Sequence, residues 1–215
     1  MIREDGHYPL WLRVWHWSNL FLFLVLLTTG IQMHYYQAAV HLISFRTCFF
    51  IHNVAGILLL LIYMLFMLGN LFRDNGRYYR IKLEDIWPGI LKQAVYYLNG
   101  IFLGRPHPYP HGENRKFNPI QKLTYLAVVW ALFPTIIITG LALLVPRYIP
   151  VSIMGMSGIA FLAFIHTYVA FFFSIFMVVH MYLATTGHTI SELYLLMLFG
   201  DKAGHKEEEG TEGAH

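Results

Sequence analysis

Two histidines on one apolar segment narrow the chemistry of this chain further than any other residues. His166 and His180 lie fourteen positions apart in a run that extends over residues 157–185. On an α-helix this spacing leaves the two side chains about 40° apart around the axis and about 21 Å apart along it. An ionisable group inside a membrane helix is costly to bury and by default marks a function. The spacing therefore predicts one ligand for each of two stacked cofactors.

The elements that must position these histidines are membrane helices. The chain has 215 residues, of which 57% are hydrophobic and 13% are charged, against about 25% charged in an average soluble domain. Stretches apolar enough to cross about 30 Å of hydrocarbon occur at residues 14–33, 49–70, 122–145 and 157–185. We therefore predict an all-α membrane protein, a four-helix transmembrane bundle. Its first span is too long for a signal peptide, so we expect it to be retained.

Outside the spans, two segments have apolar residues at helical spacing. They are residues 83–103, in the loop between the second and third spans, and residues 188–199 near the C-terminus. We expect both to lie in the membrane interface as amphipathic helices. Residues 1–200 are interpreted as a single transmembrane domain, and residues 201–215 as a polar disordered tail.

The distribution of Lys and Arg predicts the orientation of the chain in the membrane. The connections between the first and second and between the third and fourth spans hold only Arg46 and Arg147. The long loop between the second and third spans holds the remaining basic residues of the connections: Arg73, Arg77, Arg80, Lys82, Lys92, Arg105, Arg115 and Lys116. We therefore expect this loop and both termini to be cytoplasmic. The net charge of +3 reflects this asymmetry and calls for no nucleic-acid partner.

This orientation determines which histidines can meet. His16 lies near the cytoplasmic start of the first span, and His52 lies near the opposite start of the second span. Depth in the membrane then pairs His16 with His180 and His52 with His166. Two such pairs are what two b-type haems require, because each iron takes two axial imidazoles. Cys48 is the only cysteine, so covalent C-x-x-C-H attachment is excluded and any haem is held non-covalently.

Other interpretations of these polar residues remain open. The histidines could be interfacial residues of a structural membrane anchor without haem, whereas zinc is disfavoured because no third ligand accompanies either pair. Arg13 and Arg46 could bind haem propionates or extend to lipid phosphates. Gly30, Gly56 and Gly140 lie within the spans and could admit a porphyrin edge or serve ordinary helix packing.

Four sequence elements together resemble a known family. They are R-x-x-H-W at residues 13–17, His52 at the start of the second span, the pair His166 and His180, and F-N-P-I-Q-K at residues 117–122. The chain resembles, from residue 10 to about residue 185, the di-haem cytochrome b subunits of respiratory formate dehydrogenases, nickel–iron hydrogenases and thiosulfate reductase-like enzymes. The resemblance implies two haem b groups in a bacterial inner membrane.

The resemblance also implies a quinone site near the cytoplasmic haem. It makes Asn118 and Gln121, beside His180, candidates for binding quinone or menaquinone, because side-chain amides can hydrogen-bond a quinone carbonyl. An alternative interpretation, compatible with the first, is that Asn118 caps a helix whose first residue is Pro119.

The implied function is electron transfer between protein partners and the quinone pool. An iron–sulfur subunit is expected on the non-cytoplasmic face, with a molybdopterin or nickel–iron catalytic subunit, or a multihaem cytochrome, beyond it. Quinone reduction or quinol oxidation is expected on the cytoplasmic side. The loop with His107 and His111 looks closer to thiosulfate reductase-like or hydrogenase-like members, which leaves the catalytic partner open. A self-contained cytochrome b561-type transmembrane reductase is disfavoured, since such proteins typically carry two histidines on each of two helices.

Overall fold

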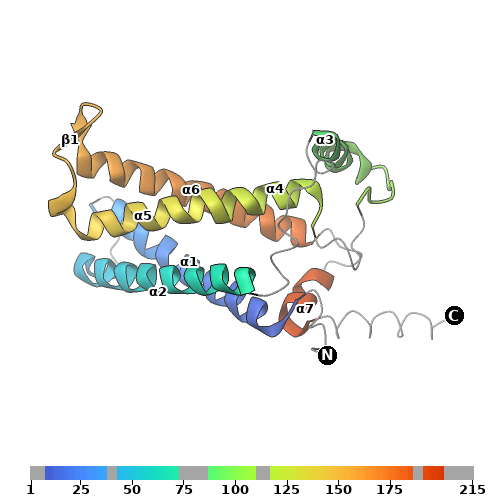
Figure 1. The fold of residues 1–215 in the computed structure, drawn as a ribbon, viewed down its shortest axis with the longest axis horizontal. Coiled ribbons are helices and arrows are strands. Elements are labelled where there is room, and N and C mark those ends of the chain that lie inside the picture. The colour runs from blue at the N-terminus through green and yellow to red at the C-terminus, as the bar shows by residue number, and fades with distance from the viewer. Residues whose placement is uncertain (1–7, 38–42, 73–86, 110–116, 186–190, 201–215) are drawn as a thin grey trace. The chain divides into compact units, whose positions relative to one another are not determined.

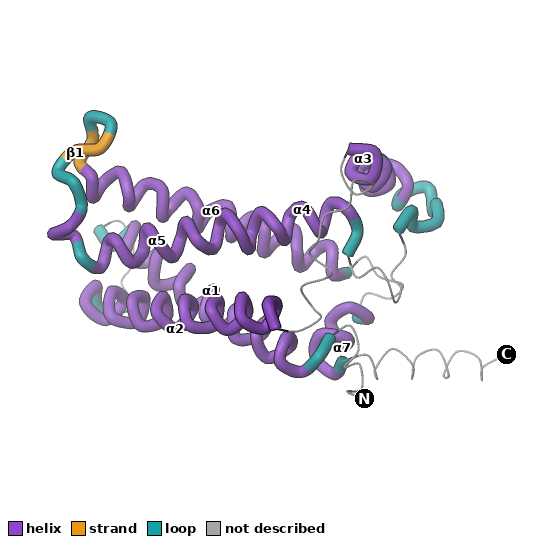
Figure 2. Tube along the Cα trace, in the orientation of Figure 1, coloured by secondary structure: helices purple, strands orange, loops and turns teal. Residues whose placement is uncertain are grey.

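Four helices in the structure are long and apolar enough to cross a membrane. The computed structural model describes residues 8–37, 43–72, 87–109, 117–185 and 191–200. The four helices are α1 (Leu10–His34), α2 (Phe45–Phe72), a continuous helical stretch over Pro119–Leu144, and α6 (Gly158–Ala184). Among the described residues, extended strand is confined to one short hairpin (Figure 2). The predicted all-α, four-helix transmembrane class is confirmed.

The third membrane helix is built from three consecutive pieces. They are α4 (Pro119–Ala127), a π-helical turn η4 (Val128–Leu132) and α5 (Phe133–Leu144). The π-helical turn ends two residues before Pro134, whose ring nitrogen has no proton to donate, and wide turns of this kind relieve such interruptions. The chain reaches Pro146 two residues after α5 ends, and a proline disfavours helical geometry in the residue before it.

The backbone divides into two compact units. The first comprises residues 1–66 and 135–215. It therefore holds α1, α6 and the short helix α7 (Glu192–Phe199), together with most of α2 and most of α5. The second comprises residues 67–134 and holds α3 (Trp87–Val95), the π-helical turn η3 (Tyr96–Gly100) and α4. All four histidines of the predicted pairs belong to the first unit.

A tight hairpin turns the chain from α5 into α6. Strand β1 (Ser152–Ile153) pairs antiparallel with β2 (Met156–Ser157). The two residues between the strands, Met154 and Gly155, have φ values of 50° and 80°. Positive φ at both central positions is what a type I′ turn requires, and this turn matches the natural twist of a two-stranded hairpin.

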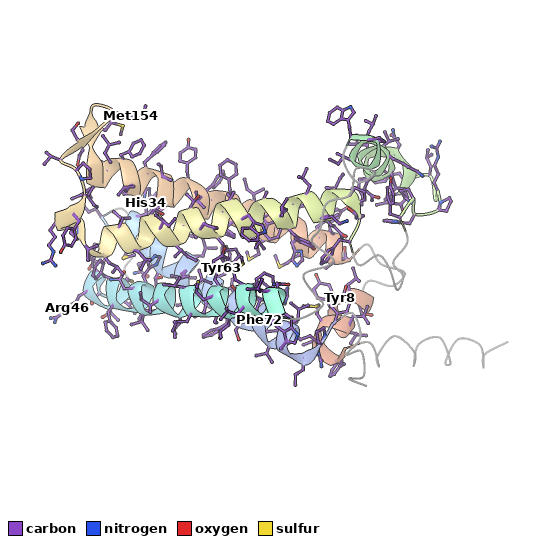
Figure 3. All side chains as sticks on the ribbon, viewed as in Figure 1. Tyr8, His34, Arg46, Tyr63, Phe72 and Met154 are labelled. Atoms are coloured by element: carbon purple, nitrogen blue, oxygen red, sulfur yellow. The ribbon has the colours of Figure 1, made fainter. Side chains whose placement is uncertain are left out.

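The helices of the first unit place the hairpin and α7 at opposite ends. Figure 1 shows α1, α2, α5 and α6 lying lengthwise beside one another, with the hairpin at one end and α7 at the other. His34, Arg46 and Met154 lie at the hairpin end, and Tyr8 lies at the α7 end (Figure 3). The connections from α1 to α2 and from α5 to α6 therefore share one end of this unit, which we call the outer end.

Helix α7 is fastened to the start of α1 by two side chains. Arg13 Nη1 donates to the carbonyl of Leu198 at 2.7 Å, and Trp17 Nε1 donates to the carbonyl of Met197 at 3.0 Å. The last carbonyls of a helix have no partner within the helix, so α1 supplies the donors that complete α7. The first residues of the helix predicted over residues 188–199 lie outside the described residues.

In the second unit, α3 contacts α4. Helical structure runs from Trp87 to Gly100, within the segment 83–103 that was predicted to be an amphipathic interfacial helix. The ammonium group of Lys92 lies 5.5 Å from the centre of the Tyr109 ring, and the rings of Tyr96 and His107 are 4.8 Å apart. The segment after η3 is thus packed against α3 and η3. Its position in the membrane interface stays a prediction.

Candidate functional site

His16, near the beginning of α1, and His180, near the end of α6, form the histidine pair farther from the outer end. We call it the inner pair. The ring centres of His16 and His180 are 6.0 Å apart, and their planes are inclined by 53°. Phe176, one turn earlier on α6, stacks on His180 with ring centres 5.5 Å apart. The Nδ1 atom of His16 is buried and has no hydrogen-bond partner among the described residues. Depth alone suggested this pairing in the sequence, and the structure brings the two rings together.

His52, near the beginning of α2, and His166, in the first half of α6, form the second pair, which lies nearer the outer end. We call it the outer pair. The ring centres of His52 and His166 are 6.2 Å apart, with planes inclined by 65°. Each Nδ1 atom has a threonine partner: Thr29 Oγ1 lies 2.9 Å from Nδ1 of His52, and Thr139 Oγ1 lies 2.9 Å from Nδ1 of His166. Unlike His16, both rings of the outer pair are therefore held at one nitrogen by a neighbouring helix.

Both pairs have the separation that a metal held between two imidazoles needs. A metal about 2 Å from each of two ligating nitrogens places the ring centres about 6 Å apart, close to the 6.0 and 6.2 Å found here. Among the described residues, no group of three or more His, Cys, Asp or Glu side chains could hold a metal ion. The donor sets are thus two imidazoles each, which suits a cofactor that supplies the remaining ligands itself, as a porphyrin does.

Two of the three glycines singled out in the spans lie against the outer histidines. A Cβ atom added at Gly30 would lie 3.4 Å from Cε1 of His52, and one added at Gly140 would lie 3.2 Å from Cε1 of His166. At Gly56 an added Cβ would meet nothing within 4 Å. Gly30 and Gly140 each follow one of the threonines of the outer pair. The same dipeptide, Thr-Gly, therefore supports both outer rings, from α1 on one side and from α5 on the other.

The threonines were not identified from the sequence. Thr29 and Thr139 are only 6% and 5% exposed, although both carry a hydroxyl group. The available signal was the repeated Thr-Gly dipeptide, at residues 29–30 of the first span and 139–140 of the third. A hydroxyl in a helix commonly bonds to a carbonyl of the preceding turn, so the residues themselves gave no sign of a second partner.

The two predicted propionate ligands lie at opposite ends of the first unit. Arg13 Nη1 donates to the carbonyl of Leu198, and the buried Nε has no hydrogen-bond partner within the described segments. Arg46 is exposed at the start of α2. Their predicted contact with haem propionates stays a prediction.

The two candidate quinone ligands belong to the second unit, where they cap α4. Asn118 Oδ1 accepts from the backbone N–H of Gln121 at 2.9 Å, and Gln121 Oε1 accepts from the backbone N–H of Asn118 at 3.1 Å. Asn118 Nδ2 donates to the hydroxyl of Tyr97 at 2.8 Å. Burial raises the pKa of Tyr97, although its hydrogen bond with Asn118 acts in the opposite direction. The phenol is therefore neutral at physiological pH. The two hydrogen bonds between Asn118 and Gln121 confirm the predicted helix cap.

His107, one of the two histidines singled out in the long loop, makes its contacts within its own unit. The backbone N–H of Tyr109 donates to Nδ1 of His107 at 3.1 Å, and Nε2 of His107 lies 3.5 Å from Nε2 of the fully buried Gln93. His107 is therefore held within the second unit. His111, which was considered with it, lies outside the described residues.

Membrane-length helices that bring histidines together in facing pairs define a class of protein, the membrane-bound haem proteins. A family described as prokaryotic cytochrome b561 matches residues 7–200 of the chain. The protein named "Putative cytochrome YdhU" of Escherichia coli (strain K12) is 37% identical over 188 residues, which cover 87% of this chain and 70% of that protein. No solved structure matches the chain.

The chain belongs to the prokaryotic cytochrome b561 family. It is a multi-pass membrane cytochrome of the b type, and membership of the family implies a b-type haem and electron transfer across the membrane. The resemblance to membrane cytochrome b proteins predicted from the sequence is confirmed.

Proposed function

We propose that this protein is a di-haem membrane subunit that transfers electrons between a non-cytoplasmic partner and the quinone pool. The observation that carries the proposal is the presence of two facing histidine pairs, with ring centres 6.0 and 6.2 Å apart, contributed by α1, α2 and α6. Haem b held by each pair would supply one-electron transfer. Two histidine ligands leave no open position on the iron for oxygen or substrate, which suits a carrier of electrons.

The three helices perform separate tasks in this proposal. Helix α6 carries one ligand of each pair, because His166 and His180 are separated by fourteen residues on one helix. Helix α1 supplies His16 to the inner pair, and α2 supplies His52 to the outer pair. The shared helix separates the two ligand positions by about 21 Å along the axis of α6.

We assign the quinone reaction to Asn118 and Gln121. Their side-chain oxygens accept hydrogen bonds within the cap of α4, and one N–H of Asn118 donates to Tyr97, so the amide N–H groups of Gln121 and the second N–H of Asn118 are the groups suited to donate to a quinone carbonyl. Reduction of a quinone consumes two electrons and two protons, and oxidation of a quinol releases them. We place this reaction on the cytoplasmic side, where the basic loop and both termini are proposed to lie.

The partners proposed for the outer side follow from the resemblance to respiratory subunits. An iron–sulfur subunit would exchange electrons near His52 and His166, and a molybdopterin or nickel–iron subunit, or a multihaem cytochrome, would perform the chemistry beyond it. We place the complex in a bacterial inner membrane. Its direction of electron flow depends on the potentials of the two centres.

A self-contained cytochrome b561-type transmembrane reductase is a second candidate function. The description of the matching family favours it. The distribution of the paired histidines over α1, α2 and α6, rather than two on each of two helices, favours the subunit of a larger complex.

The two candidates can be distinguished with the full chain in native membranes and in vesicles. A tagged chain purified from mildly solubilised membranes should bring an iron–sulfur subunit with it, and a menaquinol analogue should reduce its haem. A chain that purifies alone, is not reduced by the quinol, and passes electrons from ascorbate outside vesicles to ferricyanide inside would support the self-contained reductase and contradict our proposal.

A further inference from the structure

The two threonine hydroxyls at the outer pair each have one proton, two contacts shorter than 3 Å and a third at 3.2 Å, which is to the carbonyl of Leu26 for Thr29 and to that of Ile136 for Thr139. Thr29 Oγ1 lies 2.6 Å from the carbonyl oxygen of Val25, and Thr139 Oγ1 lies 2.7 Å from that of Thr135. These are the distances of good O–H···O hydrogen bonds. A carbonyl oxygen has no proton, so the hydroxyl must supply it, since two oxygens this close with no proton between them would repel each other.

In the contact with histidine, the ring nitrogen must then be the donor and the threonine hydroxyl the acceptor. With its proton given to the carbonyl of the preceding turn, each hydroxyl can only accept at the 2.9 Å contact with Nδ1. An acceptor at that distance selects the imidazole tautomer in which Nδ1 carries the proton. The other nitrogen, Nε2, is then the one with a free lone pair, and this is the atom that can ligate a metal.

We propose that Thr29 and Thr139 are positioning residues that hold His52 and His166 in the tautomer with a proton on Nδ1, so that Nε2 of each ring is available as an iron ligand. This inference rests on the proposed role of the outer pair as haem ligands and adds how those ligands are held. The Nδ1–H···Oγ1 bond also makes each imidazole a stronger donor to the metal, as acceptors behind ligating histidines generally do.

The arrangement distinguishes the outer centre from the inner one. The outer rings are held from two helices by the same dipeptide, whereas Nδ1 of His16 is buried without a hydrogen-bond partner in the part of the chain that the structure describes. A stronger imidazole donor favours the ferric state. The threonines are therefore expected to lower the potential of the outer haem and to leave the inner haem unaffected.

The test is a redox titration of the purified holoprotein, followed by its haem absorbance. Replacing either threonine by valine removes the hydroxyl acceptor at nearly constant volume and leaves only the backbone carbonyl of Leu26 or of Ile136 as an acceptor for the ring. In Thr29→Val and in Thr139→Val, we expect the ferrous-to-ferric ratio of one haem component at fixed potential to rise between twofold and tenfold. This corresponds to an upward shift of about 18 to 59 mV for a one-electron couple. The component that shifts should be the one that remains in His16→Ala.

The chain offers a matched control one residue away. The hydroxyl of Thr28 also bonds to carbonyls of its own helix, at 2.8 Å to Leu24 and 3.1 Å to Val25, and its side chain is exposed. Thr28→Val should therefore leave both potentials unchanged, and Thr29→Ser, which keeps the hydroxyl, should stay close to the wild type. Unchanged potentials in both valine variants, or an equal shift in Thr28→Val, would overturn the inference.

A second measurement needs no variant and separates this inference from the proposed function. In protein labelled with ¹⁵N-histidine and prepared without haem, the nitrogen chemical shifts report which ring nitrogen carries the proton. A proton on Nδ1 of His52 and His166 supports the inference, and a proton on Nε2 overturns it. A wild-type protein that takes up no haem would instead contradict the proposed function, while the ¹⁵N result would still decide the tautomer.

Discussion

Replacing Gly140 by alanine should disturb the outer pair in a measurable way. The added Cβ would lie 3.2 Å from Cε1 of His166, inside ordinary van der Waals contact, so the ring must move by a few tenths of an ångström. Such a movement lengthens the 2.9 Å contact between Thr139 and His166. The mutation therefore tests whether the glycine is present because the ring needs its space.

Three contributions determine the expected change in the free energy of unfolding: one favours the alanine variant and two oppose it. An alanine in a helix interior is favoured over glycine by about 0.5–1 kcal/mol. Weakening a hydrogen bond costs about 0.5–1.5 kcal/mol, and forcing a side chain away from its rotamer costs a similar amount. In Gly56→Ala the added Cβ meets nothing within 4 Å. This variant therefore gains the helix preference of alanine without weakening a hydrogen bond or straining a rotamer. We expect Gly140→Ala to be less stable than Gly56→Ala by about 2 kcal/mol, or about 4–8 °C in Tm for a chain of this size.

The assay is thermal unfolding of the two variants in the same detergent, together with their haem content. Gly30→Ala provides an intermediate case, since its added Cβ would lie 3.4 Å from His52. We expect the order of stability Gly56→Ala, then Gly30→Ala, then Gly140→Ala. Equal Tm values and equal haem content in all three variants would refute the reasoning that these glycines accommodate the histidine rings.

Substitutions at three further residues test other parts of the structure. Asn118→Ser keeps an oxygen that can cap α4 but removes the amide and its hydrogen bond to Tyr97, so it should retain the helix cap and lose quinol-driven haem reduction, whereas Asn118→Ala should also lose the cap, at a cost of about 0.5–2 kcal/mol; full quinol activity in the serine variant would rule out the proposed quinone role of Asn118. Arg13→Met removes the hydrogen bond to Leu198 and should make the C-terminal segment more susceptible to limited proteolysis, and an unchanged cleavage rate would contradict the role of Arg13 in holding α7. Cys48→Ala should leave the haem content unchanged, because each proposed site is made of histidines alone, and a loss of haem would show that the ligand set is incomplete.

The membrane helices could be predicted because hydropathy over about twenty residues is a strong and local signal. The first predicted span began at residue 14, whereas α1 begins at Leu10. The difference arises because the helix continues past Arg13 to Leu10, directly after Pro9, and α7 supplies a partner for the guanidinium of Arg13. The pairing of His16 with His180 and of His52 with His166 followed from depth alone, since alternating helix directions leave each histidine a single partner at its own level.

The features that could not be predicted depend on contacts between distant parts of the chain. A threonine in a helix satisfies its own hydroxyl through the preceding turn, so Thr29 and Thr139 looked complete before the helices were placed together. The bond between Trp17 and the carbonyl of Met197 joins residues 180 positions apart. The π-helical turn before Pro134 was missed for a different reason, because proline predicts an interruption but not how the backbone relieves it.

The central claim is that each histidine pair holds one haem, and haem stoichiometry tests it most directly. The measurement is the pyridine haemochrome content and the reduced-minus-oxidised spectrum of the purified full chain, compared with His52→Ala and His180→Ala. We predict two haem b groups per chain in the wild type and one in each variant, with different spectral components remaining in the two variants. No haem in the wild type, or the same haem content in all three proteins, would contradict the assignment.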